Sequence, residues 1–287
     1  MSTLRKYQER PNVVVDRAIQ AYKSNRKKTI FVEGVNDKAF FKQWTGDYIR
    51  YDGFCGKKQI EEIKKYMNLN SRFSMYYDDF LLIADVDYDL TSKLGVMNGI
   101  EYFVLDDDGN HIYNDMDIFV LNSSALKKLF SNLRIDIDDC DLDVLKNKIE
   151  STTRIFGRYR AADFKLTQGN IYSSILNGLD ITQFLDASTL DVDVSVLEGS
   201  ISSWSNSLDI EDLIVTAKGI DNEFKFKWAL SRGHDATLVL SLHLIHKYNK
   251  HFASQPFVEE RLRIGCEKAE LLSIPIGRLV HSFAGIH

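Results

Sequence analysis

Three carboxylates stand where this sequence could build a metal centre for phosphodiester chemistry. Glu33 directly follows the apolar run 29–32, and Asp85 and Asp87 follow a second apolar run, 80–84. Divalent cations such as Mg²⁺ prefer oxygen ligands. Two such ions can activate a water molecule and stabilise the leaving oxygen when a phosphodiester is cleaved. The sequence therefore predicts a Mg²⁺ site, able to accept Mn²⁺ instead, built from Glu33, Asp85 and Asp87.

The elements that must position these carboxylates are two buried strands. Short, continuous apolar runs are typical of parallel strands that helices cover on both faces. The carboxyl ends of parallel strands meet at one edge of a sheet, so we expect Glu33 to lie close to the two aspartates. Side chains two apart on a strand share a face, which predicts a common metal-facing edge for Asp85 and Asp87. The alternative is that these acids mark solvated turns, as a lone Asp-x-Asp often does.

The remaining pattern in the first half of the chain alternates strands with helices. Helices are predicted at 12–26, at 57–68 and after a cap at Asn36, and strands at 48–51 and 101–105. Residues 113–121 are interpreted as a further strand or as a passage from strand to helix. Such alternation indicates an α/β fold with a mainly parallel sheet flanked by helices.

The second half of the chain has a mainly helical pattern. Helices are predicted at 141–152, 209–218, 235–250 and 257–271, whereas 186–207, rich in Ser, Asp and Asn, is predicted to be an irregular connection. We therefore divide the chain into an N-terminal helix (1–26), a catalytic core (27–130) and a mainly helical C-terminal extension (131–287).

Composition excludes several classes of protein. The 287 residues carry a formal net charge of −5, whereas a pure nucleic-acid binder is usually basic. The three cysteines, Cys55, Cys140 and Cys266, form no Cys-x-x-Cys pair, which argues against a zinc knuckle or a disulfide framework. The polar first residues lack a signal peptide and no run is long enough to span a membrane, so a cytoplasmic location is expected. Gly53–Lys57 lacks the spacing of a P-loop, so the chain is not expected to be an ATPase itself.

The acidic segments resemble a known pattern. Phe31-Val-Glu-Gly34, with Asp37 nearby, and Ile83-Ala-Asp-Val-Asp-Tyr-Asp89 are similar to the TOPRIM motifs of topoisomerases, primases and OLD-type nucleases. The resemblance implies a TOPRIM-like core in which Asp85 and Asp87 hold Mg²⁺. It also implies that Glu33 serves in metal binding or acid/base chemistry. Asp89 extends the motif and is a further candidate ligand.

Later segments narrow the resemblance to bacterial TOPRIM proteins that occur beside ABC-type ATPases. These segments are 114–118, which precedes a helix, Phe156-Gly-Arg-Tyr-Arg160, Asp163-Phe-Lys165 and Arg232-Gly-His-Asp235. The best-known family of this kind supplies the effector nuclease of the PARIS antiphage system. The resemblance implies a toxic nuclease that acts on RNA, specifically tRNA. It further implies a separate ABC-type ATPase as partner and a homodimer as the active form. No membrane association is expected, because no apolar run is long enough to span a membrane.

Further candidate residues have a structural alternative in each case. Asp117 could add a carboxylate to the metal site, or it could be a surface aspartate before a helix. Lys57, Lys58, Arg158 and Arg160 could contact nucleic-acid phosphates, although charge runs are usually solvated faces. Arg232, His234 and Asp235 could reach a phosphate or the partner, but Asp235 could equally be an N-cap.

Two other functions remain open from the sequence. A catalytically silent TOPRIM scaffold that binds an ATPase or a nucleic acid is the first, because fold does not guarantee activity. A primase or topoisomerase fragment is the second, although the chain lacks a zinc-binding cysteine set and offers no tyrosine that stands out for strand transfer.

Overall fold

The computed structural model describes residues 9–91, 96–168, 174–176, 178–204 and 210–285, without the side chains of Asp139 and Cys140. The chain divides into two compact units. Unit 1 comprises Met1–Val86, Val96–Asp108 and Lys268–His287, and unit 2 comprises Asp87–Gly95 and Gly109–Glu267. Each unit therefore gathers segments that are distant in the sequence.

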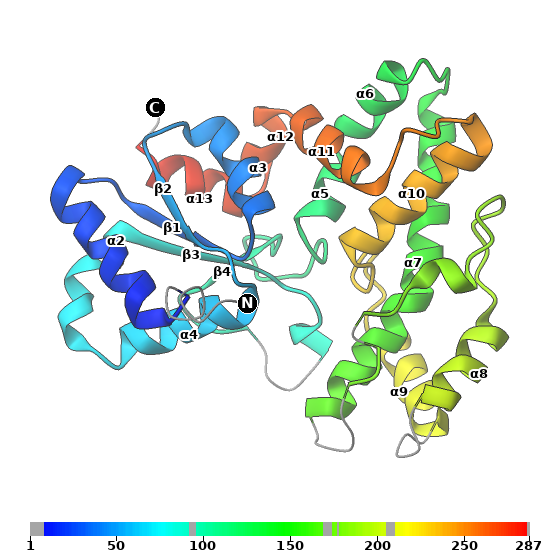
Figure 1. Ribbon diagram of the computed structural model, residues 1–287, viewed down its shortest axis with the longest axis horizontal. Helices are drawn as coiled ribbons and strands as arrows, with labels where there is room; N and C mark the ends of the chain where they lie inside the picture. The colour runs from blue at the N-terminus through cyan, green and yellow to red at the C-terminus, as the bar shows by residue number, and fades with distance from the viewer. Residues whose placement is uncertain (1–8, 92–95, 169–173, 177, 205–209, 286–287) are drawn as a thin grey trace. The chain divides into compact units, whose positions relative to one another are not determined.

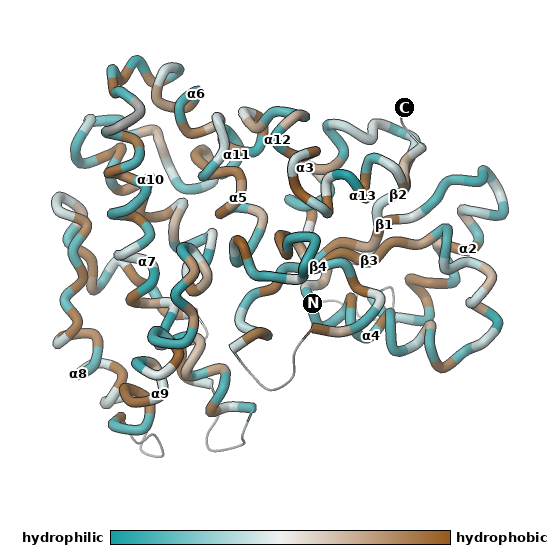
Figure 2. Tube along the Cα trace, turned by 180° about the vertical axis from the view of Figure 1, so that it is seen from behind, coloured by the Kyte–Doolittle hydropathy of each residue, from teal (hydrophilic) through white to brown (hydrophobic). Residues whose placement is uncertain are grey.

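Unit 1 is built on a parallel sheet, which confirms the predicted α/β class. Its described residues form four strands in the order β2-β1-β3-β4. The strands are β1 (Thr29–Val32), β2 (Arg50–Gly53), β3 (Phe80–Asp85) and β4 (Glu101–Phe103). All of β1 and most of β3 are buried, as expected for parallel strands covered on both faces. Figure 2 shows both strands as hydrophobic stretches of the chain.

Helices cover both faces of this sheet. Helices α3 (Val35–Thr45) and α13 (Pro275–Phe283) lie on one face, and α2 (Pro11–Asn25) and α4 (Lys57–Asn68) lie on the other (Figure 1). The 3₁₀ helix η1 (Ser71–Asp79) and the short helix α12 (Lys268–Ser273) complete the unit. The chain's last segment thus belongs to the sheet unit and not to the helical extension predicted at 131–287.

The loop after β2 is tied to the backbone around Glu33. Gly53 pairs with Val32 at a φ of 103°, and a Cβ there would stand 2.6 Å from the Val32 carbonyl oxygen. Glycine is required for both reasons. Phe54 N donates to Val32 O at 3.0 Å and Gly56 N donates to Glu33 O at 2.9 Å. These bonds fix the backbone of Glu33 at the end of β1.

Unit 2 is helical over nearly all of its described residues. Its elements are η2 (Asp89–Thr91), α5 (Met116–Asn122), α6 (Ala125–Asn132), α7 (Asp139–Gln168), η3 (Ile181–Phe184), α8 (Val194–Trp204), α9 (Ile210–Glu223), α10 (Gly233–Tyr248) and α11 (Gln255–Gly265). The long helix α7 packs against α9 and α10, and α10 packs against α5 and α11. Across both units, no described helix is long and apolar enough to cross a membrane.

Several predicted elements are corrected by the structure. Residues 113–121, predicted to be a strand or a passage from strand to helix, contain no strand: 116–121 belong to α5, whose N-cap is Asp115. The irregular interpretation of 186–207 is wrong over α8, where Leu197 and Ile201, four apart, are fully buried. Helix α3 begins before Asn36, and the residue that bonds its N-terminus is Asp37, whose Oδ2 accepts from Gly34 N at 2.7 Å.

Candidate functional site

In unit 1, Glu33 and Asp85 meet at the carboxyl ends of two paired strands. Strands β1 and β3 are neighbours, with Phe31 opposite Leu82. Glu33 Oε1 accepts a hydrogen bond from Asp85 N at 2.7 Å. This bond orients the glutamate across the end of β3. The predicted proximity of these two residues is therefore found in the structure.

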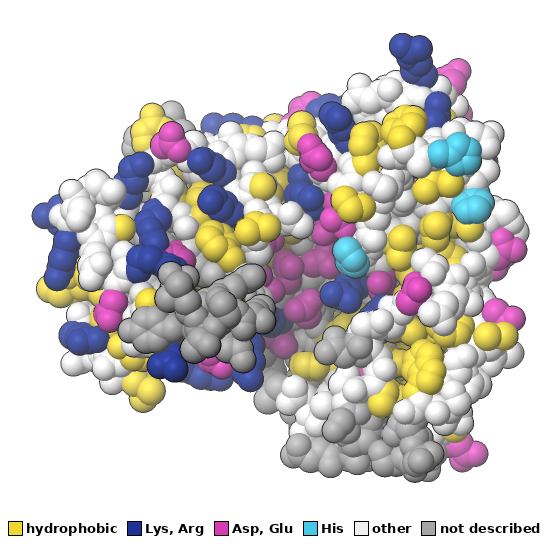
Figure 3. Space-filling model, viewed as in Figure 1, with side chains coloured by type: hydrophobic (Ala, Val, Ile, Leu, Met, Phe, Trp, Pro, Cys, Tyr) yellow, Lys and Arg dark blue, Asp and Glu magenta, His cyan; other side chains and the backbone are white. Residues whose placement is uncertain are grey.

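Lys57 brings a positive charge to the same end of the sheet. It begins α4, and its Nζ donates to the carbonyl oxygen of Val86 at 2.7 Å. The Nζ also lies 5.5 Å from the centroid of the Tyr102 ring. Lys58 is exposed on the next position of the helix. Figure 3 shows many Lys and Arg side chains over the part of the molecule that holds α2 and α4.

Asp87 does not continue the strand as the sequence predicted. Strand β3 ends at Asp85, Val86 is fully buried, and Asp87 has a left-handed backbone with a φ of 48°. Aspartate tolerates this conformation better than most residues. The same-face argument for Asp85 and Asp87 is therefore wrong, since it requires an extended backbone through both. Asp89 follows in η2 and is buried.

Within unit 2, Asp87 lies close to the acids at the start of α5. Asp87 N donates to Asn114 O at 3.3 Å. Asp115 caps α5 by accepting from Ile118 N at 2.9 Å, and it also accepts from Gly233 N of α10 at 2.6 Å. Burial raises the pKa of Asp115, and the charges of Asp117 and Asp87 raise it further.

Asp117 lies in the first turn of α5 and is paired with a cation. Arg263 Nη1 of α11 lies 3.2 Å from Asp117 Oδ1. Burial raises the pKa of Asp117, and the Arg263 guanidinium opposes that rise. Asp117 is thus neither exposed nor ahead of the helix, and the structure gives this carboxylate an arginine partner that the sequence did not indicate.

The Arg232–Asp235 segment forms the start of α10. Arg232 is the N-cap position, so Asp235 is not the cap that the sequence suggested. Asp235 is buried, and its Oδ1 lies 3.2 Å from Arg160 Nη2. Burial raises the Asp235 pKa, and Arg160 opposes this. His234 points its Nδ1 at Glu259 Oε1 of α11, 2.9 Å away.

Two of the predicted phosphate contacts are engaged within unit 2. Arg160 is buried and donates to Leu176 O and Leu179 O as well as to Asp235. Its guanidinium is therefore not presented to a ligand at the surface, which corrects the prediction. Arg158 is largely covered, and its Nη1 lies 3.8 Å from Asp221 Oδ2.

Sequence reasoning missed Asp115 and Glu259. A signal for Asp115 was present, because Asn or Asp ahead of an apolar run often marks a helix N-terminus. Glu259 gave no such signal, since its partners lie on another helix and only the fold brings them together.

Carboxylate oxygens suit a hard divalent cation. The candidate carboxylates as they stand do not form a complete coordination sphere. Burial raises the pKa of Asp115, and the neighbouring acids Asp117 and Asp87 raise it further. A cation would relieve that repulsion and favour the charged forms. In the part of the chain that the structure describes, no three His, Cys, Asp or Glu side chains are grouped closely enough to hold one metal ion.

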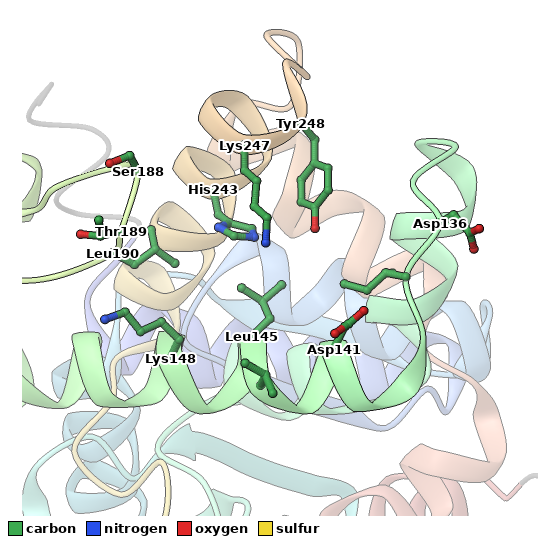
Figure 4. Close-up of a pocket in the computed structure, with 12 residues that line it drawn as sticks. Asp136, Asp141, Leu145, Lys148, Ser188, Thr189, Leu190, His243, Lys247 and Tyr248 are labelled. Carbon is green, nitrogen blue, oxygen red and sulfur yellow. The ribbon is translucent and has the colours of Figure 1, made fainter.

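A separate hollow of about 440 Å³ lies within unit 2, away from these acids (Figure 4). Leu145 and Lys148 of α7 line it, with Leu190 and with His243 and Lys247 of α10. His243 is buried against the Tyr248 ring, and burial followed by the charge of Lys247 lowers its pKa to about 4.

Comparison with models of protein families and with curated proteins finds no match for this chain.

Proposed function

We propose that this chain is a Mg²⁺-dependent endonuclease with a TOPRIM-like core. The observation that carries the proposal is the hydrogen bond from Asp85 N to Glu33 Oε1, 2.7 Å long. It joins the glutamate of one motif to the first aspartate of the other at adjacent ends of parallel strands. Ligands of α/β sheets gather at such strand ends.

The residues of the proposed site have distinct roles. Glu33, Asp85 and Asp87 would hold Mg²⁺ or Mn²⁺, with Asp89 as a further candidate. The bound ion would supply Lewis-acid activation of the phosphodiester and of water. Glu33 can also take or return a proton, because its carboxylate is held in place by the Asp85 amide. Lys57, beside the Val86 carbonyl, can balance the charge of a phosphate near the end of β3.

The substrate and partner are proposed from the motif resemblance. The chain is similar in its motifs to AriB, the effector nuclease of the PARIS system. We therefore propose that it cleaves tRNA as a toxic effector, is restrained and released by a separate AriA-like ABC-type ATPase, and is active as a homodimer.

Isosteric variants test the nuclease proposal. Glu33→Gln, Asp85→Asn and Asp87→Asn each remove one negative charge, and Glu33→Gln keeps an oxygen that can accept from Asp85 N. We expect each to lower cleavage of purified tRNA by about 10²-fold or more while thermal unfolding stays near that of the parent. The losses should be non-additive, because the groups act as one unit. Duplex DNA, assayed in parallel with and without Mg²⁺, tests the substrate class.

The control is Asp47→Asn, which removes an exposed carboxylate of unit 1 paired only loosely with Lys42, at 3.4 Å. It should cleave like the parent. If Glu33→Gln and Asp85→Asn both retain the parent's RNA cleavage and its toxicity on induction, the assigned site is wrong. Retained toxicity without any cleavage would instead support the silent-scaffold alternative.

Co-purification tests the partner proposal. The intact chain should bind an ATPase encoded beside it, with much of the contact on the later helices or the 186–207 segment, which contains α8. Failure of the intact chain to bind that ATPase would reject the partner. Unchanged binding after deletion of 186–207 would reject only the role of this segment.

A further inference from the structure

The hollow in unit 2 has the size and the walls of a small-molecule site. Its volume is about 440 Å³, and ligand pockets commonly measure about 300–1,000 Å³. It lies between α7 and α10, which pack against each other, and residues 188–190 form a further wall. Every residue that lines it belongs to unit 2, so the hollow is a feature of this unit alone.

Hydrogen bonds hold the wall around Leu190 in place. Leu190 N donates to Asp186 O at 2.7 Å, and Leu190 O accepts from Thr152 Oγ1 of α7 at 2.6 Å. The next residue, Asp191, is paired with Lys148 of α7. The wall is therefore tied to α7 at two successive residues. Small-molecule sites are usually preformed in this way.

Helix α7 presents an acid, an apolar side chain and a base in order along the hollow. Asp141, Leu145 and Lys148 are spaced by four and then three residues, which places them on one face of a helix. At about 1.5 Å per residue, Asp141 and Lys148 are about 10 Å apart along the axis. Leu145 is buried, whereas Asp141 is exposed. This face therefore suits a ligand with an apolar middle and two different polar ends.

Helix α10 adds a neutral hydrogen-bonding group. His243 and Lys247 reach from α10 toward Leu145 of α7 (Figure 4). The histidine is 7% exposed, and its Nδ1 is buried with no hydrogen-bond partner among the described residues. Burial, followed by the charge of Lys247, lowers the His243 pKa to about 4. The ring is therefore neutral near pH 7, where it can form a hydrogen bond with a hydroxyl group.

Positive charge comes from two lysines on different helices. Lys247 makes no ion pair within the part of the chain that the structure describes, and its Nζ lies 5.4 Å from the centroid of the Tyr248 ring. Lys148 is paired with Asp191, but both side chains are substantially exposed, and such pairs are weak. An ammonium group has three donors, so Lys148 can bind a phosphate while it keeps this partner.

The order of these groups matches one class of ligand. In a nucleoside monophosphate, the phosphate, the sugar hydroxyls and a flat base follow one another. We propose that this hollow binds a nucleoside monophosphate whose base carries an exocyclic amine. Its phosphate lies against Lys148 and Lys247, and its ribose hydroxyls face His243. This proposal goes beyond the nuclease function and does not depend on cleavage.

The base occupies the opposite end of the hollow. It packs on Leu145 beside the Tyr248 ring, as unpaired bases commonly pack against aromatic side chains. Its amine donates to the Asp141 carboxylate, which accepts hydrogen bonds but cannot donate them. Adenine, cytosine and guanine carry such an amine, whereas hypoxanthine presents a carbonyl in its place. Asp141 therefore selects among bases, and the lysines do not.

Calorimetric titration of the full chain with adenosine monophosphate tests the site. EDTA is present, so that no divalent ion brings the nucleotide to the carboxylates of unit 1. Adenosine and inorganic phosphate each carry only part of the ligand, and each should bind at least about 10-fold more weakly. Inosine monophosphate should also bind about 10-fold or more weakly, because a hydrogen bond to a charged group is lost.

Substitutions at the two ends should act differently. Lys247→Gln should weaken binding of adenosine monophosphate by about 10-fold or more. Asp141→Asn should bring the adenosine and inosine nucleotides within a few-fold of each other, because an amide can accept from an amine and donate to a carbonyl. The matched controls are Lys250→Gln and Asp143→Asn, whose side chains do not line the hollow. Both controls, and Glu33→Gln of the proposed catalytic site, should bind like the parent.

Several results would overturn the proposal. Inorganic phosphate that binds as tightly as the nucleotide would reduce the hollow to an anion patch. Binding that neither Lys247→Gln nor Asp141→Asn changes would place the nucleotide elsewhere, as would a loss confined to Glu33→Gln. Failure of the adenosine, cytidine and guanosine monophosphates to bind would exclude a nucleotide site. None of these results bears on the nuclease proposal, which is measured by cleavage.

Discussion

Gly233 is the position where one added methyl group should most directly disturb the acids of α5. A Cβ there would stand 2.2 Å from Asp115 Oδ1 and 2.6 Å from Asp117 Cβ. Neither neighbour can easily retreat, because Asp115 Oδ1 is bonded to Ile118 N and Asp117 is anchored in the first turn of α5. Gly233→Ala must therefore move the start of α10 away from the start of α5.

Three effects determine the size of the change in the free energy of unfolding. Alanine gains up to about 1 kcal/mol over glycine in helix propensity. Loss of the hydrogen bond from Gly233 N to the buried Asp115 carboxyl removes about 1.5–3 kcal/mol. Overpacking removes about 1–3 kcal/mol more. The unfavourable effects win, and we expect a net destabilisation of about 2–4 kcal/mol.

Urea unfolding of the full chain, followed by circular dichroism, measures this change. The control is Gly219→Ala in α9, where a Cβ would meet nothing within 4 Å. It should be as stable as the parent or more stable by up to about 1 kcal/mol. If Gly233→Ala also proves as stable as the parent, the close approach of α10 to Asp115 is wrong.

Three further predictions concern unit 2. Gly157→Ala should destabilise the chain by about 2–4 kcal/mol in urea, because its Cβ would stand 1.7 Å from Leu230 O; parental stability would contradict this packing. The pKa of Asp115 is raised in the folded state, so this residue stabilises the fold at acid pH and the contribution is lost as pH rises above about 4. Asp115→Asn should flatten that part of the curve of unfolding free energy against pH. His243 has the opposite sign, since its folded pKa is lowered to about 4. The free energy of unfolding should fall by about 1–2 kcal/mol as pH drops from about 6.5 to 4, after allowance for solvent in the adjoining hollow. His243→Gln should remove that fall. If the variant keeps it, the buried ring is not its cause.

The sheet and the Glu33–Asp85 contact could be predicted because local pattern determines them. The runs 29–32 and 80–84 are apolar and short, and strands joined through helices pair in parallel. Once β1 and β3 are neighbours, the residues that follow them must lie at one edge. That part of the site depends on nothing beyond periodicity and topology.

The local errors come from segments too short or too polar to show a period. Helix α5 has only seven residues, so its apolar run fits a strand as well as a helix. Helix α8 is rich in serine, and its buried positions are few, while Asp193 caps it by accepting from Val196 N at 3.0 Å. For both helices, the aspartate at the N-terminus indicates a helix better than the spacing of the hydrophobic residues does.

The remaining errors concern partners that are remote in the sequence. From the sequence, Asp235 could be interpreted as a cap because its ion pair was not visible there. Its partner, Arg160 of α7, lies 75 residues earlier in the chain. Because Arg160 is engaged in this ion pair, it is not one of the phosphate-binding residues that the sequence predicted. Nothing in the spacing of these residues indicates that they meet, since the packing of α7 against α10 brings them together.

Asp117 shows how such partners change the assignment of a site. A carboxylate counted from the sequence looks equally able to bind a metal wherever it lies. In the fold, Arg263 stands 3.2 Å from Asp117 and also contacts Glu259. A guanidinium at that distance repels a divalent cation, and metal binding by Asp117 would first have to break this ion pair. Asp117 is therefore better suited to hold Arg263 beside the His234–Glu259 pair than to serve as a ligand, and the proposed metal ligands are Glu33, Asp85 and Asp87 without it.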